Sequence, residues 1–189
     1  SASTKLYVFY TPWRKLFGDK IKTIRHVFTP QVSFNYAPDF SSSRYGYYET
    51  YQKTDANGNV SLVEYSPYSN GLYGVPGKGK TGSMSVDISN NFEMKIKSDA
   101  DSTGEKKISL IDELGASMSY NFATDIRPLS DLSTRLRLKL SKSYTLNLNA
   151  VFASYAYELD ENGRPVLSNT KTLWGMGKFG RFQGMSQNI

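Results

Sequence analysis

The residues most suggestive of chemistry form a nucleotide-binding pattern. Gly74, Gly79, Lys80 and Thr81 satisfy the spacing G-x-x-x-x-G-K-[ST], in which backbone N–H groups and a lysine hold phosphates at the start of a helix. That chemistry requires a strand before the pattern and a helix after it. Residues 83–97 instead alternate between polar and apolar types, which is typical of a strand. The pattern therefore predicts a flexible basic loop that leads into a strand.

Other catalytic and metal-binding residues are scarce. The chain of 189 residues has no Cys and one His, which excludes thiolate sites, disulfides and multi-histidine metal sites. His26 lies on an apolar face, which predicts a hydrogen-bonded histidine near a membrane interface, with a titrating role left open. Residues 99–104 begin like a calcium loop, but Leu110 stands where a bidentate Glu is required. We expect no enzyme, no cofactor and no metal site.

The charge balance does not indicate a nucleic-acid partner. The net charge is +6 and the pI is about 9.3, beside 14 Tyr and 10 Phe. The basic residues are scattered and interleaved with acids, and no RNA-binding motif is present. We therefore expect no nucleic acid among the partners.

Alternation with a period of two residues dominates the chain. Apolar residues occupy mainly the even positions of residues 82–97, 108–122, 132–140, 144–152 and 25–36, with polar residues between them. Shorter runs at residues 6–10 and 166–174 give about seven strands. The connections include a long Tyr-rich segment at 37–81 with a hairpin signal at 55–59, turns at 141–143 and 160–165, and a polar loop at 98–105.

The strand lengths favour a membrane barrel. Strands of soluble sandwiches usually have about 5 or 6 residues, whereas a tilted membrane-crossing strand needs about 9 to 11. The sequence therefore predicts an all-β fold, in which antiparallel strands form part of a large transmembrane outer-membrane β-barrel. Seven strands are too few, and an odd number, for a bacterial single-chain barrel. We expect residues 1–189 to be a segment of one barrel domain, with an extracellular loop at 37–81.

Parity assigns side chains to the two faces of this expected barrel. Apolar residues would face lipid and polar residues a hydrated lumen. The lipid-facing residues would include Met84, Val86, Ile88, Met118, Leu136, Leu138, Leu146 and Leu148. The lumen would hold a basic stripe that could attract lipid phosphates, formed by Lys95, Lys97, Arg135, Arg137 and Lys139. The plainer interpretation of this stripe is a solvated barrel interior.

Several stretches resemble one family. Residues 25–40, the run Tyr45, Gly46, Tyr47 and Tyr48, and residues 107–112 and 119–122 are similar to the lipopolysaccharide-assembly outer-membrane proteins called LptD, in a divergent branch. The resemblance covers about residues 24–165. It implies a large barrel in the cell outer membrane that inserts lipopolysaccharide into the outer leaflet, with a plug lipoprotein and a periplasmic bridge protein as partners.

We therefore expect part of a lipopolysaccharide transport barrel. It would contact outer-membrane lipid and lipopolysaccharide, and the remaining strands of the same barrel. The alternative is a soluble or surface-anchored β-rich binding domain that uses its Tyr-rich loop as the contact surface. Short turns on the periplasmic side would place residues 141–143 in the periplasm and the loop at 37–81 outside the cell.

Overall fold

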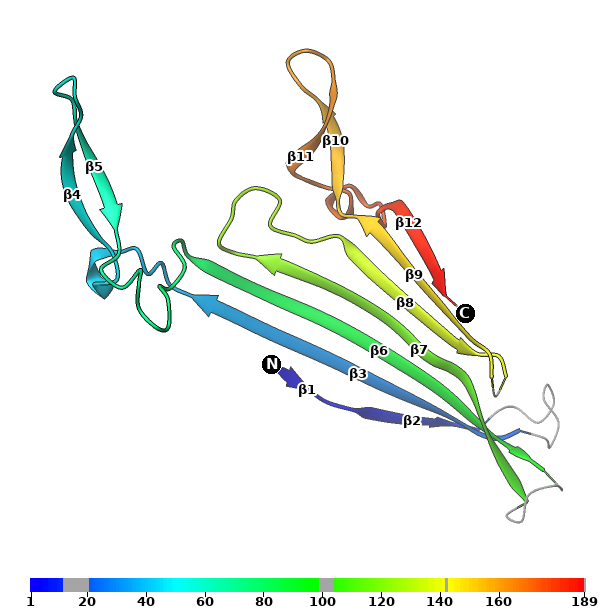
Figure 1. The fold of residues 1–189 in the computed structure, drawn as a ribbon. Coiled ribbons are helices and arrows are strands. Elements are labelled where there is room, and N and C mark those ends of the chain that lie inside the picture. The colour runs from blue at the N-terminus through cyan, green and yellow to red at the C-terminus, as the bar shows by residue number, and fades with distance from the viewer. Residues whose placement is uncertain (12–20, 99–103, 142, 189) are drawn as a thin grey trace. The chain divides into compact units, whose positions relative to one another are not determined.

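A computed structural model describes residues 1–11, 21–98, 104–141 and 143–188 (Figure 1). The chain divides into two units, one made of Ser1–Phe34 with Met84–Ile189 and the other of Asn35–Ser83. Residues 99–103, which make up most of the calcium-like run at 99–104 and of the polar loop at 98–105, lie outside the described residues. Each unit is built from strands, which confirms the predicted all-β class.

The first unit is dominated by a meandering antiparallel sheet (Figure 1). Its strand order is β1, β3, β6, β7, β8, β9, β12, with β2 also paired to β3. The bounds are β1 Ala2–Ser3, β2 Leu6–Tyr10, β3 Ile21–Ala37, β6 Thr81–Lys97, β7 Glu105–Asn121, β8 Leu132–Lys139, β9 Thr145–Ala153 and β12 Arg181–Asn188. Within the described residues the sheet is open, because β12 and the β1–β2 side form its two edges. This arrangement fits part of a barrel.

Strand register divides the side chains into two faces. Leu136 pairs with Leu148 and Leu138 with Leu146, whereas Arg135 pairs with Asn149. Cross-strand partners share a face and neighbours along a strand alternate. We call the side carrying the leucines the apolar face and the side carrying Arg135 the polar face.

The unit has almost no packed core. Leu132, Ala153, Tyr155 and Ala156 are the buried hydrophobic residues of the described chain. They gather where β8, β9 and β10 (Tyr155–Leu159) meet, rather than along the sheet. A soluble sandwich buries its apolar face against a second sheet, and the described residues provide no such layer over the leucines. No described helix is long and apolar enough to cross a membrane.

The second unit is a hairpin with an aromatic base. Strands β4 (Glu49–Thr54) and β5 (Val60–Tyr65) pair in register, and the expected turn at 55–59 joins them. Gly58 adopts a φ of 84° there, a conformation that favours glycine. Edge-to-face contacts join Phe40 to Tyr45 and Tyr47, and Tyr47 to Tyr68, near the short 3-10 turn η1 (Ser43–Tyr45).

The run at 166–174 does not form a strand of the main sheet. Strand β11 (Pro165–Thr172) pairs with β10 in a separate hairpin, and Trp174 begins the 3-10 turn η2 (Trp174–Met176). The last strand of the main sheet is β12, which alternation does not reveal. Its register against β9 shifts between Phe182 and Gly184, and this irregularity moves its side chains out of the period of two.

Paired cysteines can test the position of β12, because the chain has no native Cys. Ser186 lies opposite Asn149, at a separation of about 4.5 to 5.5 Å between Cα atoms, which suits a disulfide. We expect Asn149→Cys with Ser186→Cys to cross-link on mild oxidation, as shown by mobility on a non-reducing gel. Asn149→Cys with Gln187→Cys should not cross-link, because Gln187 points to the other face. Equal cross-linking of the two pairs would contradict the register.

Candidate functional site

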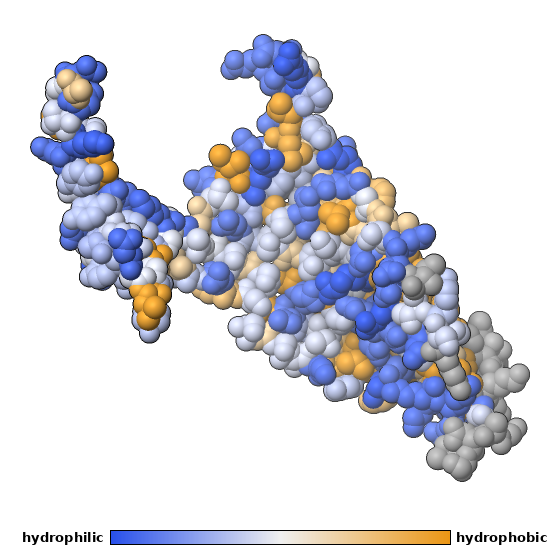
Figure 2. Space-filling view, in the orientation of Figure 1, coloured by the Kyte–Doolittle hydropathy of each residue, from blue (hydrophilic) through white to orange (hydrophobic). Residues whose placement is uncertain are grey.

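The polar face brings the expected basic residues together. Arg135, Arg137 and Lys139 alternate along β8, and Arg135 reaches Asp87 on β6. This contact places the odd-numbered positions of β6, including Lys95 and Lys97, on the same face. Hydrophilic residues gather over the sheet toward the end where the short turns lie (Figure 2).

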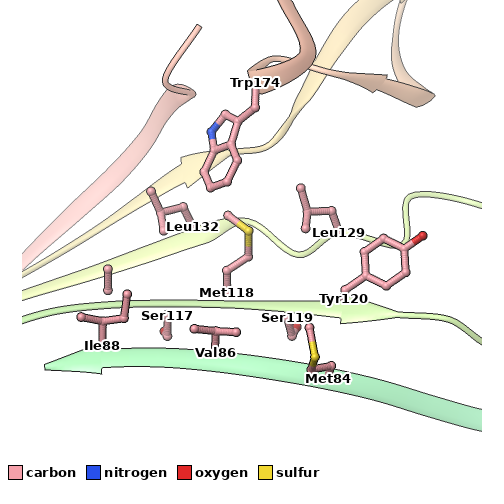
Figure 3. Close-up of a pocket in the computed structure, with 11 residues that line it drawn as sticks. Met84, Val86, Ile88, Ser117, Met118, Ser119, Tyr120, Leu129, Leu132 and Trp174 are labelled. Atoms are coloured by element: carbon pink, nitrogen blue, oxygen red, sulfur yellow. The ribbon is translucent and has the colours of Figure 1, made fainter. Parts of the chain in front are cut away.

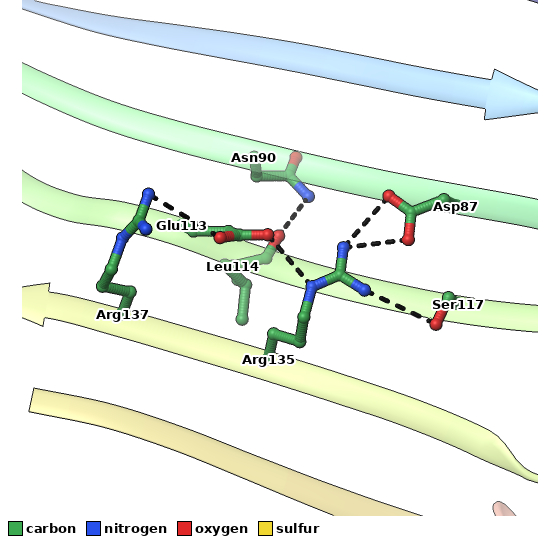
Figure 4. A network of polar contacts seen from close by, with 7 residues as sticks. All are labelled: Asp87, Asn90, Glu113, Leu114, Ser117, Arg135 and Arg137. Carbon is green, nitrogen blue, oxygen red and sulfur yellow. Dashed lines mark hydrogen bonds and ion pairs between the residues drawn. The ribbon is translucent and has the colours of Figure 1, made fainter. Parts of the chain in front are cut away.

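Arg135 is the centre of an ion-pair network across three strands (Figure 4). Its Nη2 lies 3.0 and 2.9 Å from the two carboxylate oxygens of Asp87, and its Nε lies 3.0 Å from Glu113 Oε1. Arg137 Nη2 lies 3.8 Å from the other oxygen of Glu113. The side chains of Arg135 and Glu113 are only 33% and 25% exposed, so water screens this network less than a surface pair. The two arginines are thus neutralised by carboxylates of the same face.

Gly115 makes this geometry possible. It pairs with Arg135 across β7 and β8 and is buried. A Cβ atom at this position would lie 2.8 Å from Arg135 Nη2 and 3.2 Å from its Cζ. The guanidinium therefore lies directly over the glycine backbone on its way to Asp87.

The short-turn end of the polar face carries further charges. Glu93 binds Arg25 and also Lys107, the latter at 2.8 Å. Glu105 binds Lys22 at 2.6 Å and Lys95 at 3.3 Å. By contrast, Lys97 and Lys139 form no ion pair with a described residue. Among the described residues, positive charge is therefore in excess at this end.

Two hollows on the polar face differ in chemistry. One of about 460 Å³ lies toward the long connections and is lined by Met118, Asp131 and five serines, Ser85, Ser117, Ser119, Ser130 and Ser133. The other, of about 290 Å³, lies toward the short turns and is lined by Phe9, Thr23, Arg25, Glu93, Met94, Lys95 and Lys107. The first can exchange hydrogen bonds with hydroxyl groups, and the second can attract anions.

All eight residues expected to face lipid lie on the apolar face. The leucine pairs of β8 and β9 are in direct register, and Met84, Val86, Ile88 and Met118 line a common pocket. His26 lies on this face too, with its Nε2 at 2.9 Å from Asn90 Oδ1 and its ring stacked on Phe92. Asp112, which interrupts the apolar pattern, accepts a hydrogen bond from the Ser109 hydroxyl. Within the described ranges no three acidic or histidine side chains gather as metal ligands.

The nucleotide-binding pattern is engaged in contacts within its own unit. Gly79 donates its backbone N–H to Asp39 Oδ1 at 2.9 Å. Lys78 pairs with Glu64 at 3.0 Å and lies over the ring of Tyr48. Thr81 begins strand β6 rather than a helix. The segment lacks the helix that a phosphate site requires, as its sequence context predicts.

Sequence reasoning did not identify the acids and the glycine of the network. Asp87, Glu93 and Glu113 share the odd parity of the basic residues, so parity could have placed them on the same face. Which acid meets which base depends on strand register, which parity does not give. By parity alone, Gly115 is one of several polar-face residues of β7.

Gly115→Ala is expected to lower the free energy of unfolding by about 1 kcal/mol, because the flexible end of Arg135 can move away from the methyl but then loses its hydrogen bonds. The added methyl displaces the Arg135 guanidinium from Asp87 and Glu113. Gly184→Ala is the matched control, because a Cβ there meets no atom within 4 Å. Denaturant unfolding of the purified protein in detergent measures both. An equal effect of the two changes would mean that Gly115 has no special role under Arg135.

The second unit should respond to acid through Asp39. The Ser41 hydroxyl, followed by the backbone N–H groups of Ser41 and Gly79, lowers the pKa of Asp39 below its ordinary value of 3.8. The contribution to stability is therefore fully present above the unfolded pKa of about 3.9 and is lost as the pH falls through the lower folded pKa. We expect Asp39→Ala, which removes the oxygen that accepts the Gly79 N–H, to speed hydrogen exchange at the Gly79 amide at neutral pH. Unchanged exchange would show that this bond does not hold the loop.

The comparisons with known proteins agree with this architecture. A family model described as LptD protein matches residues 1–155, which include the main sheet from β1 to β9. No curated protein and no solved structure matches the chain. Because the family model covers most of the sequence, the chain belongs to the LptD family.

Proposed function

We propose that the chain forms part of an outer-membrane barrel that transports lipopolysaccharide and inserts it into the outer leaflet. Its membership of the LptD family supports a role in lipopolysaccharide transport and assembly. The observation that carries the proposal is an antiparallel meander, three of whose strands are long, with one apolar and one polar face. Strands β3, β6 and β7 have 17 residues each, more than the 9 to 11 or so that cross a bilayer. The role is transport, without a chemical step.

Connection lengths support an orientation in the membrane. At one end of the sheet, residues 11–20, 98–104 and 140–144 link neighbouring strands. At the other end, residues 122–131 form a link as long as 11–20, and residues 38–80 and 154–180 are much longer. Outer-membrane barrels have short periplasmic turns and longer extracellular loops. The Tyr-rich segment at 37–81 is then extracellular, and the short-turn end is periplasmic.

The polar face would line the hydrated path of the cargo. Lys97 and Lys139, which have no ion-pair partner among the described residues, would meet phosphates at the periplasmic end, and the serine-lined hollow can bind sugar hydroxyls farther along. Arg135 and Arg137 are already paired with acids, so they would stabilise the polar face rather than bind the cargo. Movement through a channel requires contacts that are individually weak, and a largely neutralised wall provides them.

The open edges of the sheet support the proposal that further strands complete the barrel. Unpaired backbone groups cannot face lipid, so β12 and the β1–β2 edge each need a neighbouring strand. The plug lipoprotein and the periplasmic bridge protein remain partners proposed from the family. Neither partner protein would bind the apolar face, because that face would contact lipid.

Leu136→Arg tests the apolar face and the transport role together. At the bilayer midplane we expect a cost of about 2 to 4 kcal/mol in folding free energy. When this variant replaces the full-length protein in its native bacterium, folded barrel in the outer membrane and lipopolysaccharide at the cell surface should both fall. Heat-modified gel mobility measures the first and surface labelling the second.

Asn147→Arg is the matched control, because it places the same charge on the polar face of the neighbouring strand β9, opposite Arg137. It should preserve folding and surface lipopolysaccharide. If depletion of the whole protein leaves surface lipopolysaccharide unchanged, the transport role is wrong. If the two arginine variants fold equally well, the apolar face does not meet lipid.

A further inference from the structure

A roofed niche lies on the apolar face, near the long connections (Figure 3). Its volume is about 340 Å³, and its lining combines Met84, Val86, Ile88, Ala116, Met118, Leu129, Leu132 and Trp174 with Ser117, Ser119 and Tyr120. The side chains of Met84, Val86 and Ile88 project from β6, and that of Met118 from β7. The volume is near the lower end of ligand pockets, about 300 to 1,000 Å³. It suits a slender apolar group.

Trp174 forms the roof and is held from several sides. Its indole Nε1 donates a hydrogen bond to the Phe179 carbonyl. The preceding residue, Leu173, donates its backbone N–H to the carbonyl of buried Ser154 at 2.8 Å. Gly175 donates its N–H to the Thr172 hydroxyl at 3.1 Å. Trp174 nevertheless remains 43% exposed, so the niche is open on one side.

The segment that carries the roof is positively charged. Residues 166–189 contain Lys171, Lys178 and Arg181 and no acid. Lys171 pairs with Glu158, and Arg181 lies over the ring of Tyr157. Lys178 forms no ion pair with a described residue, and its backbone N–H bonds to Leu173 at the base of the same turn. The turn that carries the roof of the niche therefore includes a lysine that has no acidic partner among the described residues, which suits an anionic lipid.

We propose that this niche holds one acyl chain of a lipopolysaccharide molecule in the outer leaflet, with a phosphate of that lipid near Lys178. The inference rests on the proposed function, because the orientation derived there places the long connections outside the cell and the niche at the depth of the outer leaflet. Trp and Lys are both common anchors at a membrane interface. The bound lipid would be a neighbour on the outer wall of the barrel, apart from cargo on the polar face.

Photo-cross-linking in the native bacterium tests the occupant. A benzoylphenylalanine replaces Trp174 in the full-length protein, and in a second variant it replaces Leu148, which lies on the same face outside the niche. We expect a lipopolysaccharide adduct at position 174, detected by antibody and mass spectrometry. Adding Ala116→Phe, which fills the niche, should remove most of it.

Ala150→Phe is the matched control, because Ala116 and Ala150 both flank Thr134 on the apolar face and only Ala116 lines the niche. It should leave the adduct intact, and Lys178→Gln should reduce it. Phospholipid adducts alone at position 174, or an adduct insensitive to Ala116→Phe, would overturn the proposal. Lipid adducts at position 148 but none at 174 would overturn it while the bilayer-facing assignment stands. No lipid adduct at either position would contradict that assignment as well.

Discussion

Backbone pairing between neighbouring strands is the interaction on which the rest of this structure depends. With four buried hydrophobic residues in the described chain, side-chain packing cannot hold the sheet together as it does in a soluble domain. Strand register decides which side chains meet, and a shift by one residue would turn every leucine of β8 to the polar side. Both faces therefore derive their chemistry from the pairing of β7, β8 and β9.

On the polar face, a residue of one strand determines which contacts a side chain of the next strand can make. Arg135 can reach Asp87 on β6 only because β7 presents Gly115 beneath it. The same arginine binds Glu113 on β7, so three strands are linked by one side chain. Partial burial strengthens these pairs relative to exposed ones, and their mutual neutralisation removes strong anion sites from the middle of the sheet. The polar face is therefore hydrophilic but does not bind anions strongly in the middle of the sheet.

Sequence periodicity predicts the faces better than the contacts. Long alternating runs identify β3, β6, β7, β8 and β9, because each keeps one parity over most of its length. β12 is hidden by its register shift near Gly184, and residues 166–174 alternate as a strand although they belong to a separate hairpin and turn. The basic stripe is predicted from parity alone. Its carboxylate partners depend on register between strands distant in sequence, such as the pairing of Arg135 with Asp87.

The two ends of the sheet differ because charged side chains are unevenly distributed along the polar face. Lysines concentrate toward the short turns, where Glu93 and Glu105 each bind two cations and still leave Lys97 and Lys139 unpaired with described residues. Serines line the opposite end of the polar face. An anionic molecule entering at the short-turn end would therefore meet its strongest attraction first and weaker, neutral contacts afterwards. Such a decreasing attraction favours capture at entry without trapping the molecule farther along.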